Sequence, residues 1–99
     1  MQISIPKNEV LNRFISYIKI DSQSDASSNT TPSTEKQWEI IRLLESDLKN
    51  IGISEVSVDE KGYIMATLPA TTEKKVPCIG FVAHYDTSPD FNATNINPQ

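Results

Sequence analysis

The chain has 99 residues, a length that suits one small domain or part of a larger one. Its composition, 37% hydrophobic and 22% charged, argues against a wholly disordered protein. Thirteen acidic residues against nine basic ones give a net charge of −4 without any basic stripe, which disfavours nucleic acids and anionic membrane surfaces as partners.

The first predicted element is an amphipathic helix over residues 8–20, NEVLNRFISYIKI, with Asn8 as its N-cap. Its apolar residues at helical spacing are Val10, Leu11, Phe14, Ile15 and Ile18. Residues 21–34, DSQSDASSNTTPST, contain almost nothing that belongs in a core, and they include Pro32. We therefore predict an exposed connector there, although loops of this length are often functional or mobile.

A second helix is predicted over residues 34–51. Thr34 and Gln37 fit the capping-box pattern T-x-x-Q, and Gly52 stands where a left-handed C-terminal cap is wanted. Apolar residues follow at steps of three and four and form one stripe: Trp38, Ile41, Leu44, Leu48 and Ile51. This spacing predicts a buried stripe, with Trp38 in the core rather than on a ligand-binding surface.

After Gly52 the pattern changes to that of strands. Residues 55–59, EVSVD, alternate between apolar and polar, and residues 63–68 offer a second strand with Ile64, Ala66 and Leu68 on one side. The intervening turn signal DEKG, residues 59–62, predicts that the two strands form a hairpin.

The run VPCIGFVAH, residues 76–84, is apolar on both faces of a strand, which is typical of an interior strand covered on each side. Cys78 lies inside this run, so we expect a buried thiol rather than a reactive one. Two helices followed by about three strands predict an α/β architecture.

Three observations predict a soluble cytoplasmic protein. A single cysteine makes neither an internal disulfide nor a zinc site built from several cysteines. The segment MQISIPKNEV has no basic region followed by an apolar one, so we expect no secretory signal. No apolar run approaches the ~20 residues that span a bilayer.

The candidate chemistry lies at the end of the apolar run. The only histidine, His84, precedes Asp86 by two positions, so their side chains share one side if the strand continues through them. Neutral imidazole is a zinc ligand, and a carboxylate beside it can hold the other ring N–H. Ligands also gather beyond the carboxyl ends of strands in α/β folds. By itself the pattern indicates half of a metal site, or a histidine in an ordinary polar turn.

A resemblance rests on four stretches that occur in order and with natural spacing: PSTEKQW (32–38), DEKGYIMATLPA (59–70), IGFVAHYDTSPDF (79–91) and NINPQ (95–99). Together they resemble the M20 family of dinuclear zinc exopeptidases over essentially the whole chain. The strand followed by H-x-D is shared across that family, whereas the other stretches resemble its tripeptide aminopeptidases. The resemblance implies an α/β/α sandwich with a mixed sheet, and it makes residues 1–99 the N-terminal portion of the catalytic domain.

The resemblance also implies roles for two residues. The histidine of H-x-D is a zinc ligand in that family, which indicates His84, and the following aspartate supports it and counts as catalytic, which indicates Asp86. The other ligands, the glutamate general base and a smaller second domain come later in the family's sequences. The implied cofactor is a pair of zinc ions that polarise the scissile carbonyl and lower the pKa of a bridging water. The implied substrates are tripeptides that lose their N-terminal residue, with the 99-residue chain alone expected to be inactive.

Two alternatives remain at this stage. One is another M20-type metallohydrolase, such as a dipeptidase, carboxypeptidase or deacylase, because these share H-x-D. The other is a binding module that uses an α/β scaffold without metal or catalysis. Oligomeric state does not follow from the sequence.

Overall fold

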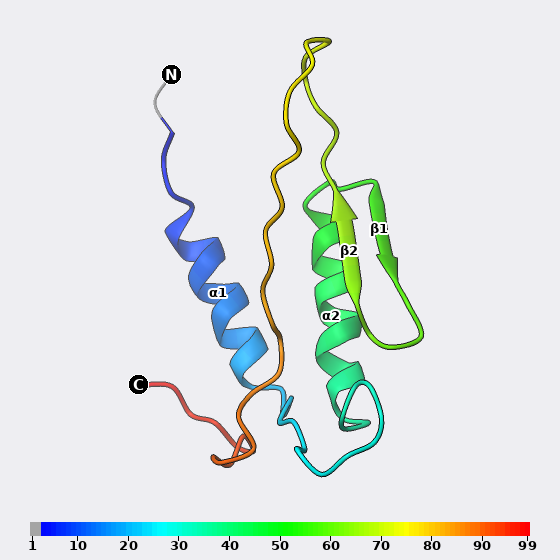
Figure 1. The fold of residues 1–99 in the computed structure, drawn as a ribbon. Helices are drawn as coiled ribbons and strands as arrows, with labels where there is room; N and C mark the ends of the chain where they lie inside the picture. The colour runs from blue at the N-terminus through cyan, green and yellow to red at the C-terminus, as the bar shows by residue number, and fades with distance from the viewer. Residues whose placement is uncertain (1–2) are drawn as a thin grey trace.

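The computed structural model describes residues 3–99, which contain two helices and two strands. In chain order these are α1 (Lys7–Ile18), α2 (Gln37–Asn50), β1 (Glu55–Val58) and β2 (Ile64–Thr67). Figure 1 shows the hairpin of β1 and β2 lying against α2, whereas α1 stands on the other side of a long extended segment. The α/β class and the hairpin are therefore confirmed.

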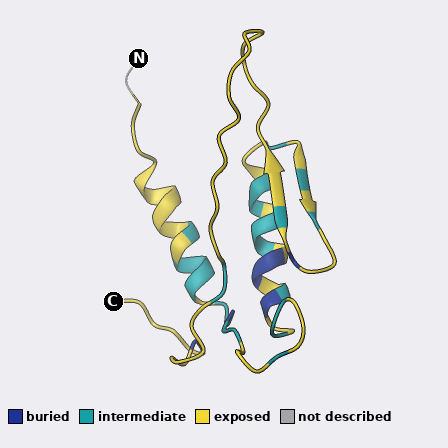
Figure 2. Cartoon of the chain, in the orientation of Figure 1, coloured by how far each residue is buried: buried dark blue, intermediate teal, exposed yellow. Residues whose placement is uncertain are grey.

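Helix α1 begins one residue before the predicted start, and Pro6 occupies the N-cap position without a side-chain hydrogen bond. The prediction of Asn8 as the N-cap is wrong, because this residue lies in the first turn of the helix. The C-terminal half of α1 is half-buried, but Val10, Leu11 and Phe14 are more than half exposed. The apolar stripe of α1 thus faces solvent along much of its length (Figure 2).

One side-chain contact ties α1 to α2. The hydroxyl of Tyr17 donates to Oδ2 of Asp47 at 2.7 Å. Burial of the phenol, together with this bond to a carboxylate, raises the pKa of Tyr17 to about 12. The phenol therefore stays protonated and keeps its donor through the neutral range.

Helix α2 begins three residues after the predicted start, because the preceding residues form tighter turns. The N–H of Gln37 donates to the carbonyl of Thr34 at 3.3 Å, which is a bond across three residues. Half of the predicted capping box is present, since Gln37 Oε1 accepts from the Thr34 N–H at 3.1 Å. The Thr34 hydroxyl donates instead to the carbonyl of Gln23 at 2.9 Å.

The predicted end of α2 at Gly52 is confirmed. Gly52 has φ of +98°, and its N–H donates to the Lys49 carbonyl at 3.0 Å. The N–H of Ile53 donates to the Leu48 carbonyl at 3.2 Å, which completes a Schellman motif.

The hairpin follows its predicted turn. The antiparallel register pairs Glu55 with Thr67 and Val58 with Ile64. In the turn, Asp59 Oδ1 accepts the N–H groups of residues 61 and 63, both at 2.9 Å. Gly62 supplies the positive φ, +82°, that closes the turn.

The apolar core of the described residues consists of Ile40 and Ile41 in α2 and Ala93 in the C-terminal tail (Figure 2). Of the predicted buried stripe, only Ile41 is buried, at 1% exposure. Trp38, Leu44 and Leu48 are half-buried, and Ile51 is exposed. A hairpin of two short strands is too narrow to cover the whole stripe, so the prediction of full burial is corrected.

The predicted interior strand over residues 76–84 is not a strand among the described residues. The segment is extended but unpaired, and it passes between α1 and the hairpin in the view of Figure 1. Val82 is 100% exposed, and the thiol of Cys78 is exposed rather than buried. A strand exists only where a neighbour pairs with its N–H and C=O groups, and no segment within residues 3–99 does so.

We expect Gly62→Ala to destabilise the protein more than Gly52→Ala. Both glycines have positive φ, so alanine costs about 1–2 kcal/mol of backbone strain at either position. At Gly62 a Cβ would also lie 2.8 Å from Ile41 Cδ1 and 2.9 Å from the Tyr85 hydroxyl, whereas at Gly52 it would meet nothing within 4 Å. Such crowding adds about 1–3 kcal/mol. Urea denaturation of both variants measures the difference, and equal losses would contradict the packing around Gly62.

Candidate functional site

The candidate pair, His84 and Asp86, lies where the unpaired segment meets an anchored turn. Nδ1 of His84 is 2.9 Å from Asp86 Oδ1 and 3.0 Å from the Asp86 carbonyl oxygen. Asp86 thus lies beside the ring and contacts Nδ1, as the hypothesis of half a metal site requires. The predicted setting, the end of a central strand, is wrong for the described residues because residues 76–83 form no strand.

The contact fixes which ring nitrogen of His84 carries the proton. Both atoms that face Nδ1 are acceptors, so Nδ1–H donates and Nε2 keeps its lone pair in the neutral ring. The imidazole is 85% exposed, so Nε2 is accessible to a ligand. A neutral ring whose non-coordinating nitrogen donates to a carboxylate is a common arrangement in metal-binding histidines.

The Asp86 carboxylate also sets the electrostatics of the pair. Its hydrogen bond and its negative charge raise the pKa of His84 above the ordinary 6.5. The ring is therefore a stronger base than a free imidazole, and a stronger base is a better donor to a metal ion.

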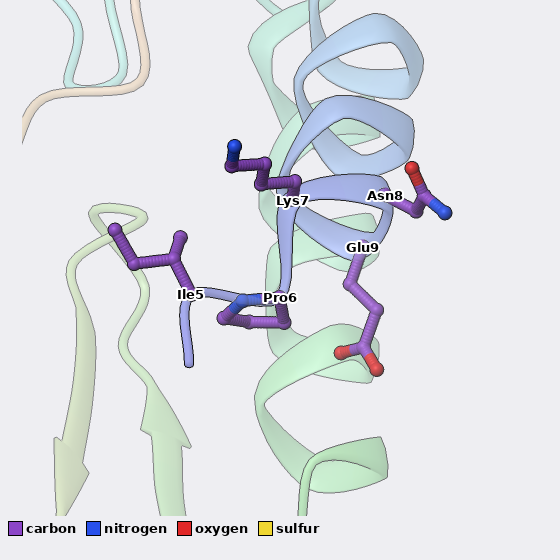
Figure 3. A pocket seen from close by; sticks show the side chains of 5 residues that line it. All are labelled: Ile5, Pro6, Lys7, Asn8 and Glu9. Atoms are coloured by element: carbon purple, nitrogen blue, oxygen red, sulfur yellow. The ribbon is translucent and has the colours of Figure 1, made fainter. Parts of the chain in front are cut away.

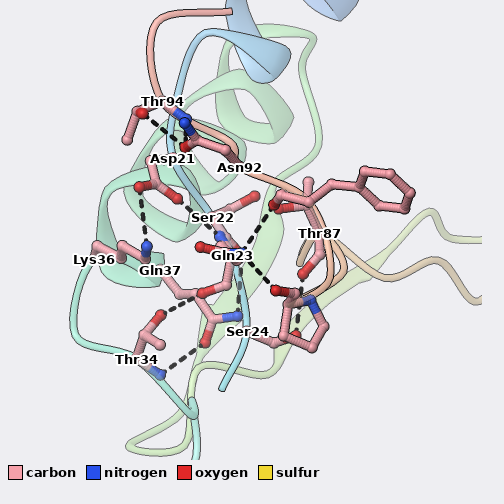
Figure 4. Close-up of polar contacts among 12 residues, drawn as sticks. Asp21, Ser22, Gln23, Ser24, Thr34, Lys36, Gln37, Thr87, Asn92 and Thr94 are labelled. Carbon is pink, nitrogen blue, oxygen red and sulfur yellow. Dashed lines mark hydrogen bonds and ion pairs between the residues drawn. The ribbon is translucent and has the colours of Figure 1, made fainter. Parts of the chain in front are cut away.

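The loop that follows α1 anchors the turn from both sides. Gln23 and Thr87 form a parallel bridge, in which Ser24 N–H donates to the Thr87 carbonyl at 3.0 Å (Figure 4). The Thr87 N–H donates to the Ser22 carbonyl at 3.2 Å, and the Ser22 hydroxyl donates to the Tyr85 carbonyl at 2.9 Å. The backbone on either side of the candidate aspartate is therefore fixed by residues 22–24, which we call the anchoring loop.

The anchoring loop is in turn held by the start of α2. Gln37 is 3% exposed, and its Nε2 donates to the Ser22 carbonyl at 3.2 Å (Figure 4). The Thr34 hydroxyl donates to the Gln23 carbonyl at 2.9 Å. The prediction of an exposed connector over residues 21–34 is thus wrong at its beginning, because Ser22 is only 2% exposed.

Two further contacts connect the turn to its surroundings. The Tyr85 hydroxyl donates to the Gly62 carbonyl at 3.1 Å, which joins the turn to the hairpin, and burial raises the pKa of Tyr85. Gln23 Nε2 donates to the carbonyls of Pro89 and Phe91, at 2.9 Å and 2.8 Å. The sequence pattern did not indicate the contacts of Tyr85 or Gln23. Of the residues that hold the turn, it singled out only Gln37, as part of the capping box.

The described residues fit one ligand position of a metal site and no more. Within residues 3–99, no three or more His, Cys, Asp or Glu side chains lie together as a metal cluster would require. His84 Nε2, with Asp86 behind its ring, is chemically suited to one coordination position. Further ligands would have to come from outside this part of the chain.

Two hollows among residues 3–99 lie away from the pair. One hollow lies at the start of α1 and is lined only by the consecutive residues 5–9 (Figure 3). A second, mostly apolar, lies between the end of α1 and the C-terminal tail, and Thr87 lines it. Neither contains His84 or Asp86, so neither supplies a binding cavity at the candidate site.

No helix within residues 3–99 has the length and apolar character needed to cross a bilayer.

The chain is similar to known proteins over nearly its whole length. It is 59% identical to peptidase T of Geobacillus thermodenitrificans over 93 residues, and 54% identical to peptidase T of Exiguobacterium sibiricum over the same length. It is 55% identical to peptidase T of Clostridium acetobutylicum over 91 residues. These matches cover 92–94% of this chain but only 22–23% of each relative. No family model matches the chain. The resemblance predicted from the sequence motifs is confirmed at the level of peptidase T.

Replacing Asp86 by Asn is expected to lower the pKa of His84 toward 6.5, because the carboxylate is the main cause of its rise. His84 is the only histidine, so an NMR titration of residues 1–99 follows a single imidazole. The matched control is Asp90→Asn, which removes a carboxylate bonded to Ser88 rather than to the ring and should leave the pKa of His84 unchanged. An imidazole that titrates identically in Asp86→Asn and in the unaltered chain would contradict the contact.

Proposed function

We propose, from its resemblance to peptidase T over nearly its whole length, that this chain forms the N-terminal portion of the catalytic domain of a tripeptide aminopeptidase. The relatives are peptidases by name, and the chain spans 23% of the length of the first of them. The rest of the catalytic domain and a smaller second domain would then lie in further sequence. The observation that carries the proposal is this identity combined with the polarised His84–Asp86 pair.

The exposed apolar surfaces support a larger catalytic domain. Residues 79–82 include Ile79, Phe81 and Val82, which are all strongly exposed, and α1 exposes Leu11 and Phe14. So many large apolar side chains exposed close together in sequence are unusual on a complete domain, and exposed apolar surface normally marks an interface. We propose that residues 76–83 become an interior strand of a mixed sheet once neighbouring strands pair with them. The two helices would then form part of an α/β/α sandwich.

At the site, His84 would hold a zinc ion through Nε2, and Asp86 would hold the Nδ1 proton and fix the direction of the ring. Two zinc ions, when bound, polarise a peptide carbonyl and lower the pKa of water. Asp86 keeps the imidazole in the tautomer that leaves Nε2 free, and the raised basicity of the ring strengthens its donation. The general base and the remaining ligands would come from further sequence, so residues 1–99 alone would not turn over substrate.

The proposal is tested with tripeptide hydrolysis by the full-length protein, by its variants and by residues 1–99 alone. His84→Ala should reduce activity to background, and Asp86→Asn should reduce it about 10–100-fold because it removes the support of a ligand. Asp90→Asn is the matched control and should keep full activity. Residues 1–99 alone should show none.

The substrate panel separates the alternatives. Release of the N-terminal residue from tripeptides, with little action on dipeptides or N-acyl amino acids, supports a tripeptide aminopeptidase. A preference for either of the other substrates would favour a different metallohydrolase of the M20 type. No hydrolysis of any of them by the full-length protein would favour a binding module. Undiminished turnover in His84→Ala would contradict the ligand assignment.

A further inference from the structure

Two buried polar side chains outside the candidate pair control the backbone beside it. Ser22 and Gln37 are 2% and 3% exposed, and they are the only polar residues fully buried among those described. Buried polar groups are costly unless they are hydrogen-bonded, and both residues are fully engaged. Their partners lie in the anchoring loop, in the turn of the candidate site and in the residues just before α2, rather than in the apolar core.

Ser22 forms hydrogen bonds to the turn on both sides of Asp86. Its hydroxyl donates to the Tyr85 carbonyl at 2.9 Å, across 63 residues of sequence. Its own carbonyl accepts the Thr87 N–H at 3.2 Å. The peptide groups that flank Asp86 are thereby held, so the Cα position from which its carboxylate reaches His84 is held as well.

Gln37 connects the start of α2 to the hydrogen bonds that Ser22 forms with the turn. Its Nε2 donates to the Ser22 carbonyl at 3.2 Å, while its Oε1 accepts the Thr34 N–H at 3.1 Å (Figure 4). The Ser22 carbonyl therefore receives two donors, one from the start of α2 and one from the turn at Thr87. Residues 76–83 on the other side of His84 provide no comparable anchor, because they are exposed and unpaired.

We propose that Ser22 and Gln37 are positioning residues for the candidate metal site: they fix the turn that carries Asp86, and so direct Nε2 of His84 toward the metal ion. This proposal rests on the function proposed above. Neither residue touches the ring, and they act through the backbone of the anchoring loop and the turn. Supports of this kind around a metal ligand typically contribute 10–100-fold to metal affinity.

The test measures the zinc affinity of the full-length protein by competition with a chelator. Ser22→Ala removes the donor to Tyr85, and Gln37→Glu removes the donor to Ser22 while it keeps an acceptor for Thr34. Each should weaken zinc binding about 10–100-fold. Ser22→Thr restores a hydroxyl and should recover most of the loss. If Ser22→Ala fails to fold, Gln37→Glu, which preserves side-chain size, still gives the answer.

Two controls separate positioning from general destabilisation. Ser27→Ala makes the same chemical change in the same connector, where the hydroxyl bonds only to Asp25. Leu44→Ala lowers stability through half-buried packing remote from the turn. Both should retain unaltered zinc affinity while the protein is folded.

The outcomes are distinguishable. The proposal is supported if Ser22→Ala and Gln37→Glu weaken zinc binding and Ser22→Thr recovers it. The two control variants should keep the zinc affinity of the unaltered protein. Unaltered affinity in both variants, with affinity lost in His84→Ala, overturns the positioning role and leaves the proposed function standing. Unaltered affinity in His84→Ala overturns both, because His84 would then be no ligand. Equal weakening in Leu44→Ala would also overturn the positioning role, since the loss would follow stability.

Discussion

The parallel pairing of Gln23 with Thr87 is the constraint on which the rest of the described structure depends. It joins the loop after α1 to a turn more than sixty residues later, through backbone bonds of 3.0 Å and 3.2 Å. Around it, Ser22 and Gln37 connect the same turn to the start of α2. Without this junction the turn that carries the His84–Asp86 pair would keep only the bond from the Tyr85 hydroxyl to the Gly62 carbonyl as its link to the hairpin. The junction therefore gives the contact between His84 and Asp86 a defined position in the fold.

The stabilisation of this junction differs from that of the α2–hairpin unit. The latter buries Ile40 and Ile41, and burial of a large aliphatic side chain contributes roughly 1.5–3 kcal/mol. The junction relies on hydrogen bonds, each worth only about 0.5–1.5 kcal/mol net, so it depends on several bonds acting together. Its polar side chains are satisfied by backbone groups of the same junction, whereas the apolar run beside it is not covered. This contrast supports the proposal that the exposed apolar run packs against further chain.

Features determined by neighbouring residues were predicted well from the sequence. The cap at Gly52 and the turn closed by Gly62 follow from short patterns. The spacing of two placed His84 and Asp86 on one side only for a continuing strand, so their contact within a turn did not follow from it. The strand predicted over residues 76–84 does not form within residues 3–99, because pairing needs partners that periodicity cannot supply. Cys78 is exposed for the same reason. The anchoring role of Ser22 left no signal, because a hydroxyl that bonds a carbonyl 63 residues away has no periodic pattern. The metal role proposed for His84 rests on family resemblance, since the described residues offer only one ligand position.

The most direct measurement is hydrogen exchange of individual backbone amides in residues 1–99. Thr87 and Ser24 donate across the junction, whereas Phe81 and Val82 lie in the exposed, unpaired run. If the junction holds the turn, Thr87 and Ser24 exchange slowly while Phe81 and Val82 exchange rapidly, because exchange requires the donated bond to open. Exchange at Thr87 and Ser24 as rapid as at Phe81 would show that the junction does not hold the turn, and it would contradict the account.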